Sequence, residues 1–327
     1  MIGVEFLKGM GLGNRLFCYI TARSIAEDRG AVFATAGREY LGADFMELDL
    51  GEEIHDVSAY RHYHEKEKRL YLTTSPHDMV HGCFVGGTDE ELSRVPDNTI
   101  LYGNLQAEDY FRPHRNEIGE WLRVKKEFES YEYTSDDLCI LNVRGGEYAG
   151  DPALFLRRKY WTDAMKVMRS ENPRMRFMIV TDDTEAAAKL LPGIEAHHFS
   201  PEKDYVTVKN ARYLVISNSS FAFFPAYTST TVHRVIAPKY WARHNVSNGY
   251  WASEQNIYDE FEYLGRDGKL YSPEECRREL AAFHYPETQP YAEEDPKVAA
   301  VRKRNERQRL VTLAVHKAQR ILLRQGK

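Results

Sequence analysis

Residues 9–17 read Gly-Met-Gly-Leu-Gly-Asn-Arg-Leu-Phe, between an apolar run at 1–7 and an amphipathic helical pattern that extends to Ile25. A strand, a glycine-rich turn and a helix N-terminus in this order present backbone N–H groups to an anion, which predicts a phosphate-binding turn in an α/β protein. The alternative is a tight strand-to-helix connection in which the glycines only supply unusual backbone angles.

Length and composition indicate a globular chain. Its 327 residues are 43% hydrophobic, enough to bury a sizeable core in one large or two medium domains. No apolar run approaches the ~18 residues of a membrane span, and the N-terminus lacks the layout of a signal peptide, so we expect a cytoplasmic protein. The four cysteines have no zinc-ligand or disulfide-framework spacing, and we expect reduced thiols and no metal site.

Charge is distributed unevenly along the chain. The net charge is −5, but residues 297–327 carry ten Lys or Arg against one acid, Glu306. Apolar residues recur there at helical spacing, which predicts a basic amphipathic helix over 293–327. Such a helix can lie on an anionic membrane surface or pack on the body or in an oligomer, and the oligomeric state stays open. Nucleic acid is not expected as a partner, because aromatic interleaving is missing.

The second half alternates short apolar runs with helical patterns. Strands are expected at 138–143, 177–181, 214–217 and 235–237, and helices at 160–169, 185–191 and 221–227. This alternation predicts a doubly wound parallel sheet. We expect an N-terminal α/β domain over 1–130, closed by a helical pattern at 117–128, and a Rossmann-like domain over 131–292. The scattered histidines between 55 and 81 are interpreted as surface residues or acceptor contacts.

Polar residues follow three of the expected strands, where ligands bind in such sheets. Arg144 stands beside two glycines and can reach a phosphate with its planar guanidinium. Asp182 follows the second strand, and Ser219 and Ser220 follow the third, where hydroxyls can donate to a phosphate or cap a helix. Asp182 and Asp183 can likewise serve only as helix caps.

Taken together and in this order, five segments resemble the α-1,2-fucosyltransferases of glycosyltransferase family 11. The resemblance covers about residues 2–230, and the family belongs to the wider superfamily of α-1,2-, α-1,6- and protein O-fucosyltransferases. The segments are Gly11-Leu12-Gly13-Asn14-Arg15-Leu16-Phe17, Tyr102-Gly103-Asn104-Leu105-Gln106-Ala107-Glu108-Asp109-Tyr110-Phe111, Asn142 to Tyr148 with the later pair Tyr160-Trp161, Thr181-Asp182-Asp183, and Asp204 through Phe224.

The resemblance implies a glycosyltransferase of the B architecture, with two Rossmann-like domains, that moves fucose from GDP-fucose to a hydroxyl of a glycan acceptor. It implies an inverting reaction without a metal or other cofactor, with the nucleotide sugar on the second domain and the acceptor largely on the first. The basic amphipathic tail of a protein expected in the cytoplasm separately suggests a surface polysaccharide or lipid-linked oligosaccharide as the acceptor. By position, Arg144 would hold the β-phosphate, Asp204 would accept hydrogen bonds from guanine, and the turn at 11–14 would close over the leaving group. The donor-binding residues expected are Gly11, Gly13, Asn14, Arg15, Asn142, Arg144, Asp182, Asp204, Asn218, Ser219 and Ser220.

Departures from the family pattern leave alternatives open. One arginine of the family motif is replaced by Gly145, its aspartate by Glu147, and Arg15 stands where the family has glutamine. Arg15 could restore the lost charge, and Glu147 could act as the catalytic base or only orient Arg144. Another nucleotide sugar, or a non-catalytic sugar-binding protein on a degenerate scaffold, remains open. A dinucleotide oxidoreductase would need a third glycine, but the Gly11-Leu12-Gly13 segment leads to Leu16.

Overall fold

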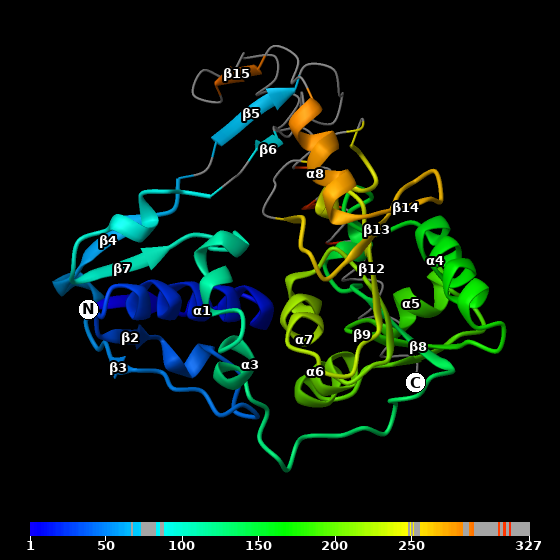
Figure 1. Cartoon of the computed structure of the whole chain (residues 1–327), viewed down its shortest axis with the longest axis horizontal. Helices are drawn as coiled ribbons and strands as arrows, with labels where there is room; N and C mark the ends of the chain where they lie inside the picture. The colour runs from blue at the N-terminus through cyan, green and yellow to red at the C-terminus, as the bar shows by residue number, and fades with distance from the viewer. Residues whose placement is uncertain are drawn as a thin grey trace.

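The computed structural model describes residues 1–66, 68–72, 83–85, 88–247, 249, 251, 256–283 and 288–290, together with Arg307, Leu310, Val311 and Ala314. Two α/β units lie side by side, and a linker over 122–137 passes below both (Figure 1). The basic helix expected over 293–327 lies outside the described residues except for those last four, which are helical.

The N-terminal unit is built on a five-stranded parallel sheet in the order β3-β2-β1-β7-β4. Helix α1 follows β1 directly and packs on one face of the sheet, and the short helix α3 precedes the linker. The bounds are β1 (Ile2–Glu5), α1 (Leu12–Asp28), β2 (Phe33–Ala36), β3 (Glu52–Glu53), β4 (Arg61–His64), β7 (Thr99–Tyr102) and α3 (Ile118–Trp121).

The C-terminal unit contains a seven-stranded sheet in the order β10-β9-β8-β11-β12-β13-β14, parallel except for its last pair. Every residue of β8 is buried, which explains why the strand is apolar except for Asn142. The elements are β8 (Leu138–Val143), α4 (Arg158–Glu171), β9 (Arg176–Thr181), α5 (Thr184–Leu190), β10 (Glu195–His197), α6 (Pro201–Lys209), β11 (Tyr213–Ile216), η7 (Ser220–Ala222), α7 (Phe223–Tyr227), β12 (Arg234–Pro238), β13 (Glu262–Leu264), β14 (Leu270–Tyr271) and α8 (Pro273–Ala282).

A small antiparallel sheet joins segments that are far apart in the sequence. It has the order β15-β5-β6, so a strand near residue 290 pairs with one near residue 70. Its strands are β5 (Lys68–Leu72), β6 (Cys83–Val85) and β15 (Thr288–Pro290).

Each large sheet reverses its winding direction at one point. In the first sheet, β2 and β3 lie on one side of β1, and β7 and β4 lie on the other. In the second, β9 and β10 lie on one side of β8, and β11 and β12 on the other. The carboxyl ends of the strands at such a switch point form the usual ligand crevice of a doubly wound sheet, so the fold has two of them.

The predicted α/β fold class with two parallel, doubly wound sheets is confirmed, whereas the predicted helix over 117–128 is wrong. Helix α3 ends after one turn at Trp121, because the following residues pair with a loop of the first unit. Val124 forms an antiparallel bridge with Met46, and the N–H of Lys125 donates to the carbonyl of Phe45 at 2.9 Å. The domain boundaries at 130 and 292 stay predictions.

Candidate functional site

The two switch points meet directly at Gly13 and Ser220. Gly13 lies in the first turn of α1, the helix that follows β1. Ser220 begins η7, just after the carboxyl end of β11. A Cβ at position 13 would collide with the carbonyl of Ser220 and the N–H of Phe221, so only glycine fits here. The glycine-rich turn and the serine pair, more than 200 residues apart, therefore share one place in the fold.

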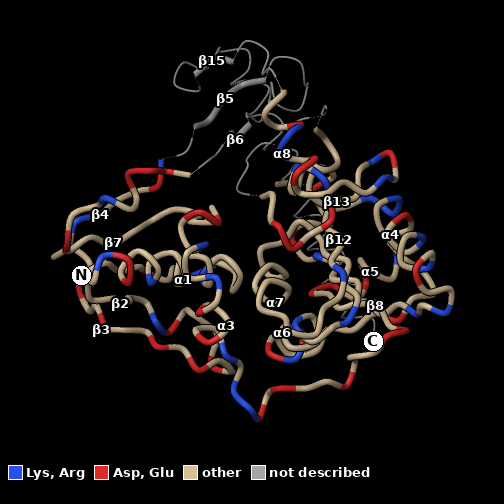
Figure 2. Tube along the Cα trace, viewed as in Figure 1, with Lys and Arg blue, Asp and Glu red and all other residues tan. Residues whose placement is uncertain are grey.

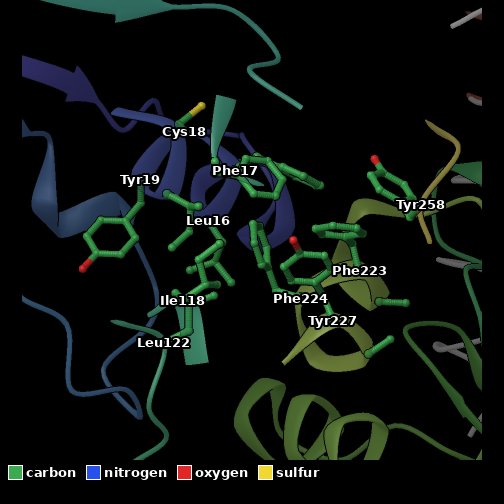
Figure 3. Packing of buried hydrophobic residues seen from close by; sticks show 14 of the residues in the cluster. Leu16, Phe17, Cys18, Tyr19, Ile118, Leu122, Phe223, Phe224, Tyr227 and Tyr258 are labelled. Atoms are coloured by element: carbon green, nitrogen blue, oxygen red, sulfur yellow. The ribbon is translucent and has the colours of Figure 1, made fainter. Parts of the chain in front are cut away.

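Aromatic side chains join the two units around this contact (Figure 3). Phe17 of α1 stacks on Phe223 of α7 at a centroid distance of 4.7 Å and lies equally close to Phe224. Phe111, from another of the five segments, lies 6.1 Å from Phe17. All four are fully buried, and α7 is an uncharged stretch facing α1 in Figure 2. The phenylalanines in these segments therefore build the interface between the units.

The start of α1 has no side-chain cap. Gly11 is the N-cap residue and has no side chain that could cap the helix, and nothing lies within 4 Å of a Cβ added there. The first N–H groups of a helix have no partner within it and carry its positive dipole end. Anion binding by the N–H groups of this turn stays a prediction.

The side chains of Asn14 and Arg15 form hydrogen bonds within their own unit, the N-terminal one. The Oδ1 atom of Asn14 accepts from Nε2 of Gln106 at 3.1 Å, which links two of the five segments. The Arg15 guanidinium donates to the carbonyls of Leu41 at 3.3 Å and Leu7 at 3.4 Å, and its buried Nε has no partner. Burial lowers the pKa of Arg15. Arg15 therefore braces the glycine-rich turn, and a phosphate contact by Arg15 stays a prediction.

Arg144 lies at the carboxyl end of β8 and forms two ion pairs. Its guanidinium lies 2.7 Å from Asp182 Oδ2 and 3.4 Å from Glu147 Oε1. Asp182 also accepts from the N–H of Gly145 at 2.7 Å, which closes the loop after β8 onto the end of β9. Gly146 has φ +42°, a backbone conformation that favours glycine, and it lies against the Asp182 carboxylate. The contact with Arg144 agrees with an orienting role for Glu147.

Two residues after β11 contain buried oxygens that have no hydrogen-bond partner among the described residues. Asn218 donates from Nδ2 to the carbonyl of Leu154 at 3.1 Å, which turns its buried Oδ1 away without a hydrogen bond. The buried Oγ of Ser217 also has none. Asn142, on the neighbouring β8, donates to the Val180 carbonyl at 3.4 Å. Buried oxygens without a partner are rare in native proteins, and two on consecutive residues indicate a region where water or a ligand group binds.

Ser219 and Asp183 act as caps, as their alternative interpretations predicted. Ser219 Oγ accepts from the N–H of Phe221 at 3.3 Å, and Asp183 caps α5 by accepting from Ala186 at 3.0 Å. Of the serine pair, the half-buried Ser220 lies against the turn at Gly13.

Asp204 is buried in α6, and both carboxylate oxygens have partners. Oδ1 accepts from the N–H of Phe199 and Oδ2 contacts Nδ1 of His198, each at 3.0 Å. Burial raises the pKa of Asp204, and these hydrogen bonds oppose the shift. The half-exposed His198 follows β10 and had not been identified from the sequence. Guanine recognition at Asp204 stays a prediction, with His198 as its immediate neighbour.

Besides the phenylalanine packing, polar contacts around Glu108 connect the two units. Glu108 belongs to the segment Tyr102 to Phe111, and no role was predicted for it from the sequence. Its carboxylate accepts from the Tyr227 hydroxyl at 3.1 Å and pairs with Arg112 at 2.9 Å. Arg115 lies over the Tyr227 ring, 3.9 Å from its centroid, and pairs with Glu260 at 3.0 Å. Burial raises the pKa of Glu108. These contacts hold the two units in the arrangement of Figure 1.

Two further findings concern the described residues alone. They contain no group of three or more His, Cys, Asp or Glu side chains placed to hold a metal ion, and metal independence stays a prediction. No described helix is long and apolar enough to cross a membrane.

No protein-family model and no curated protein sequence matches the chain. Several solved structures resemble it. The fucosyltransferase NodZ from Bradyrhizobium is 15% identical, with a TM-score of 0.42 over 72% of this chain and 94% of NodZ. FUT1 of Arabidopsis thaliana in complex with GDP is 11% identical, with a TM-score of 0.43 over 72% of this chain and 70% of FUT1. POFUT1 in complex with GDP-fucose is 10% identical, with a TM-score of 0.40 over 72% of this chain and 98% of POFUT1.

Proposed function

We propose that the protein is a glycosyltransferase that binds a nucleotide sugar between the two switch points. The observation that carries the proposal is the backbone contact of Gly13 with Ser220, because it brings the uncapped start of α1 to the strand end that carries the serine pair. Arg144 follows β8, the strand next to β11. A diphosphate placed there would meet N–H groups from one unit and hydroxyl and guanidinium groups from the other.

These groups suit the chemistry of glycosyl transfer. As the bond between the sugar and the diphosphate breaks, negative charge accumulates on the departing phosphate. Fixed N–H groups, hydroxyls and one guanidinium stabilise such charge without reorganising. In this proposal the Arg144 guanidinium exchanges part of its pairing with Asp182 and Glu147 for the β-phosphate, and Ser217 Oγ supplies a further donor from its buried position.

The resemblance of the five segments supports GDP-fucose as the donor, a glycan hydroxyl as the acceptor and a relationship to glycosyltransferase family 11. In this assignment the transfer inverts the anomeric carbon and needs no metal. Asp204 and His198 would meet the guanine at the carboxyl edge of the second sheet. The basic segment 297–327 would hold the protein against an anionic membrane surface, which suits a lipid-linked or surface-polysaccharide acceptor.

Nucleotide-dependent thermal stabilisation tests the proposal. We expect GDP to raise the melting temperature more than UDP, ADP or CMP, because a ligand that binds only the native state stabilises it. Arg144→Ala should lower GDP affinity by roughly 10- to 100-fold, the usual range for hydrogen bonds to a charged group. Arg176→Ala is the matched control, because Arg176 pairs with Asp137 at the opposite end of β9.

One observation favours a second candidate, a non-catalytic protein that binds sugar nucleotides or glycans. Arg144 is already paired with both Asp182 and Glu147, which leaves its guanidinium less available to a phosphate. Transfer of radiolabelled fucose from GDP-fucose, to water or to a glycan, separates the two candidates. GDP binding without any release of fucose would favour the binding protein, and stabilisation by UDP alone would change the donor.

A further inference from the structure

The face of the N-terminal sheet opposite α1 carries a row of polar and aromatic residues at its carboxyl edge. Val4 and Leu101 point into the main core with α1, so Glu5 and Tyr102 point to the other face. His64 pairs with Tyr102 in the strand register, and Ala36 pairs with Glu5.

A small apolar cluster covers much of this face. It consists of Met1, Ala34, Ala36, Ile54, Val57, Tyr60 and Ile100, and the Tyr102 ring packs against it. Ile54 covers Gly3, one step back from the carboxyl edge. Glu5 and Tyr102 are half-buried at the edge, whereas His62 and His64 are exposed.

The rings of this row form a stack. The His64 ring lies 5.0 Å from the Tyr102 ring at an interplanar angle of 18°. His62 lies 5.2 Å from the same ring at 53°, and its Nε2 contacts the Val57 carbonyl at 2.9 Å. Tyr102 thus contacts two imidazoles of β4, and the His64 ring that stacks on it is exposed to solvent.

A carboxylate stands beside these rings. The Tyr102 hydroxyl donates to Glu5 Oε2 at 2.6 Å, which fixes the ring and leaves Oε1 of Glu5 as an acceptor. No basic side chain among the described residues is in an ion pair with Glu5. A diphosphate would be repelled here, whereas a neutral molecule with several hydroxyl groups could donate to Glu5 while its apolar C–H face covers the rings.

We infer that Glu5, Tyr102 and His64 form a saccharide-binding site. This inference rests on the proposed function, for which it supplies the place of the acceptor: one sugar unit packs on the His64 ring and donates a hydroxyl hydrogen bond to Glu5. The site lies on the first sheet, whereas the guanidinium and hydroxyl groups that would bind the donor follow strands of the second sheet.

Saturation-transfer NMR tests the inference with four disaccharides at millimolar concentration: lactose, maltose, cellobiose and sucrose. We expect at least one to receive signal from the wild-type chain. His64→Ala and Glu5→Gln should each weaken that disaccharide's binding by roughly tenfold, through loss of ring contact or of a charge-assisted hydrogen bond. Glu53→Gln, an exposed acid on β3 of the same sheet, is the control and should change nothing.

The GDP-induced thermal shift, measured on the same samples, separates the two proposals. A GDP shift that is unchanged in His64→Ala and Glu5→Gln, together with lost saccharide signal, supports the inference. Normal GDP binding with no signal from any disaccharide, or with signal unaffected by both substitutions, overturns the inference and leaves the proposed function standing. Saccharide binding without any nucleotide binding would instead count against the proposed function alone.

Discussion

The two switch points of this molecule use the same topology for different purposes. At the first, between β1 and β7, the motif residues mostly pack: Gly13 admits the backbone at Ser220, and Arg15 braces carbonyls of its own unit. At the second, between β8 and β11, they keep groups that can bind a ligand. The Arg144 side chain is a third exposed, and the buried Ser217 hydroxyl has no hydrogen-bond partner among the described residues.

The difference shows that the role of a glycine-rich turn after a strand depends on whether protein backbone or a ligand packs against it. The turn at Gly13 is approached by protein backbone, so its glycine is explained by packing. The helix start beside it still offers uncapped N–H groups. The first switch point thus closes the site, and the second supplies most of its reactive groups.

The largest expected effect concerns the packing role of the first switch point. Phe17→Ala removes a fully buried ring that stacks on Phe223, and we expect a loss of about 3–5 kcal/mol in the free energy of unfolding. Urea unfolding measures it. Phe128→Ala, at a ring that is 36% exposed, is the control. Equal losses in the two variants would contradict the interface role of Phe17.

The second prediction concerns acid and the second switch point. His244 packs on Tyr160, whose hydroxyl donates to the Ile216 carbonyl at 2.7 Å, next to Ser217. Burial lowers the pKa of His244 from 6.5 to about 4. The unfolded chain therefore binds a proton more readily than the folded one, and stability falls as the pH drops from about 6.5 to about 4, by about 3 kcal/mol in full.

Urea unfolding over this pH window, with His244→Gln and with the exposed His233→Gln as control, checks the assignment. Only His244→Gln should flatten the decline in stability. A decline that is unchanged in His244→Gln would show that other groups cause it.

The third prediction compares two glycines of the turn, Gly13 and Gly11. Alanine normally stabilises a helix relative to glycine, but Gly13→Ala should lose about 1–3 kcal/mol because the new methyl group collides with the Ser220 backbone. Gly11→Ala is a matched control two residues away, where nothing lies within 4 Å of the added carbon. Thermal unfolding compares them, and a neutral Gly13→Ala would remove the contact on which the proposed site depends.

The smallest expected effect is that of Ser217→Ala, which should leave stability unchanged or raise it while lowering the affinity for GDP. Ser217→Ala removes an unpartnered buried hydroxyl, so the free protein should be unchanged or up to about 1 kcal/mol more stable. GDP affinity should fall several-fold, because the same hydroxyl is proposed as a phosphate donor. Calorimetry measures the change in GDP affinity, and thermal unfolding measures the change in stability. A destabilised variant with normal affinity would assign Ser217 a structural role.

Local patterns predicted much of the fold. The strand at 138–143 coincides with β8, and the expected helices at 160–169 and 185–191 match α4 and α5 to within two residues. The pattern at 117–128 misled because a pairing with Met46, more than 70 residues earlier, overrides it. Helical periodicity carries no information about such distant partners.

The site was predictable in its residue types but not in their partners. The segments with Arg144 and Asp182 follow neighbouring strands, so their proximity could be expected. The contact of Gly13 with Ser220 joins two separate sheets, and nothing local to either segment encodes it. The row of Glu5, Tyr102 and His64 depends on the register of three strands, which the sequence alone did not fix.

Hydrogen–deuterium exchange with and without GDP tests the central claim most directly, because it locates the nucleotide without assuming an acceptor. We predict slower exchange in peptides covering 11–15, 144–148 and 217–221, which come from both switch points, and unchanged exchange across β4. Protection confined to other segments, or none at any GDP concentration, would contradict a nucleotide site between the two switch points.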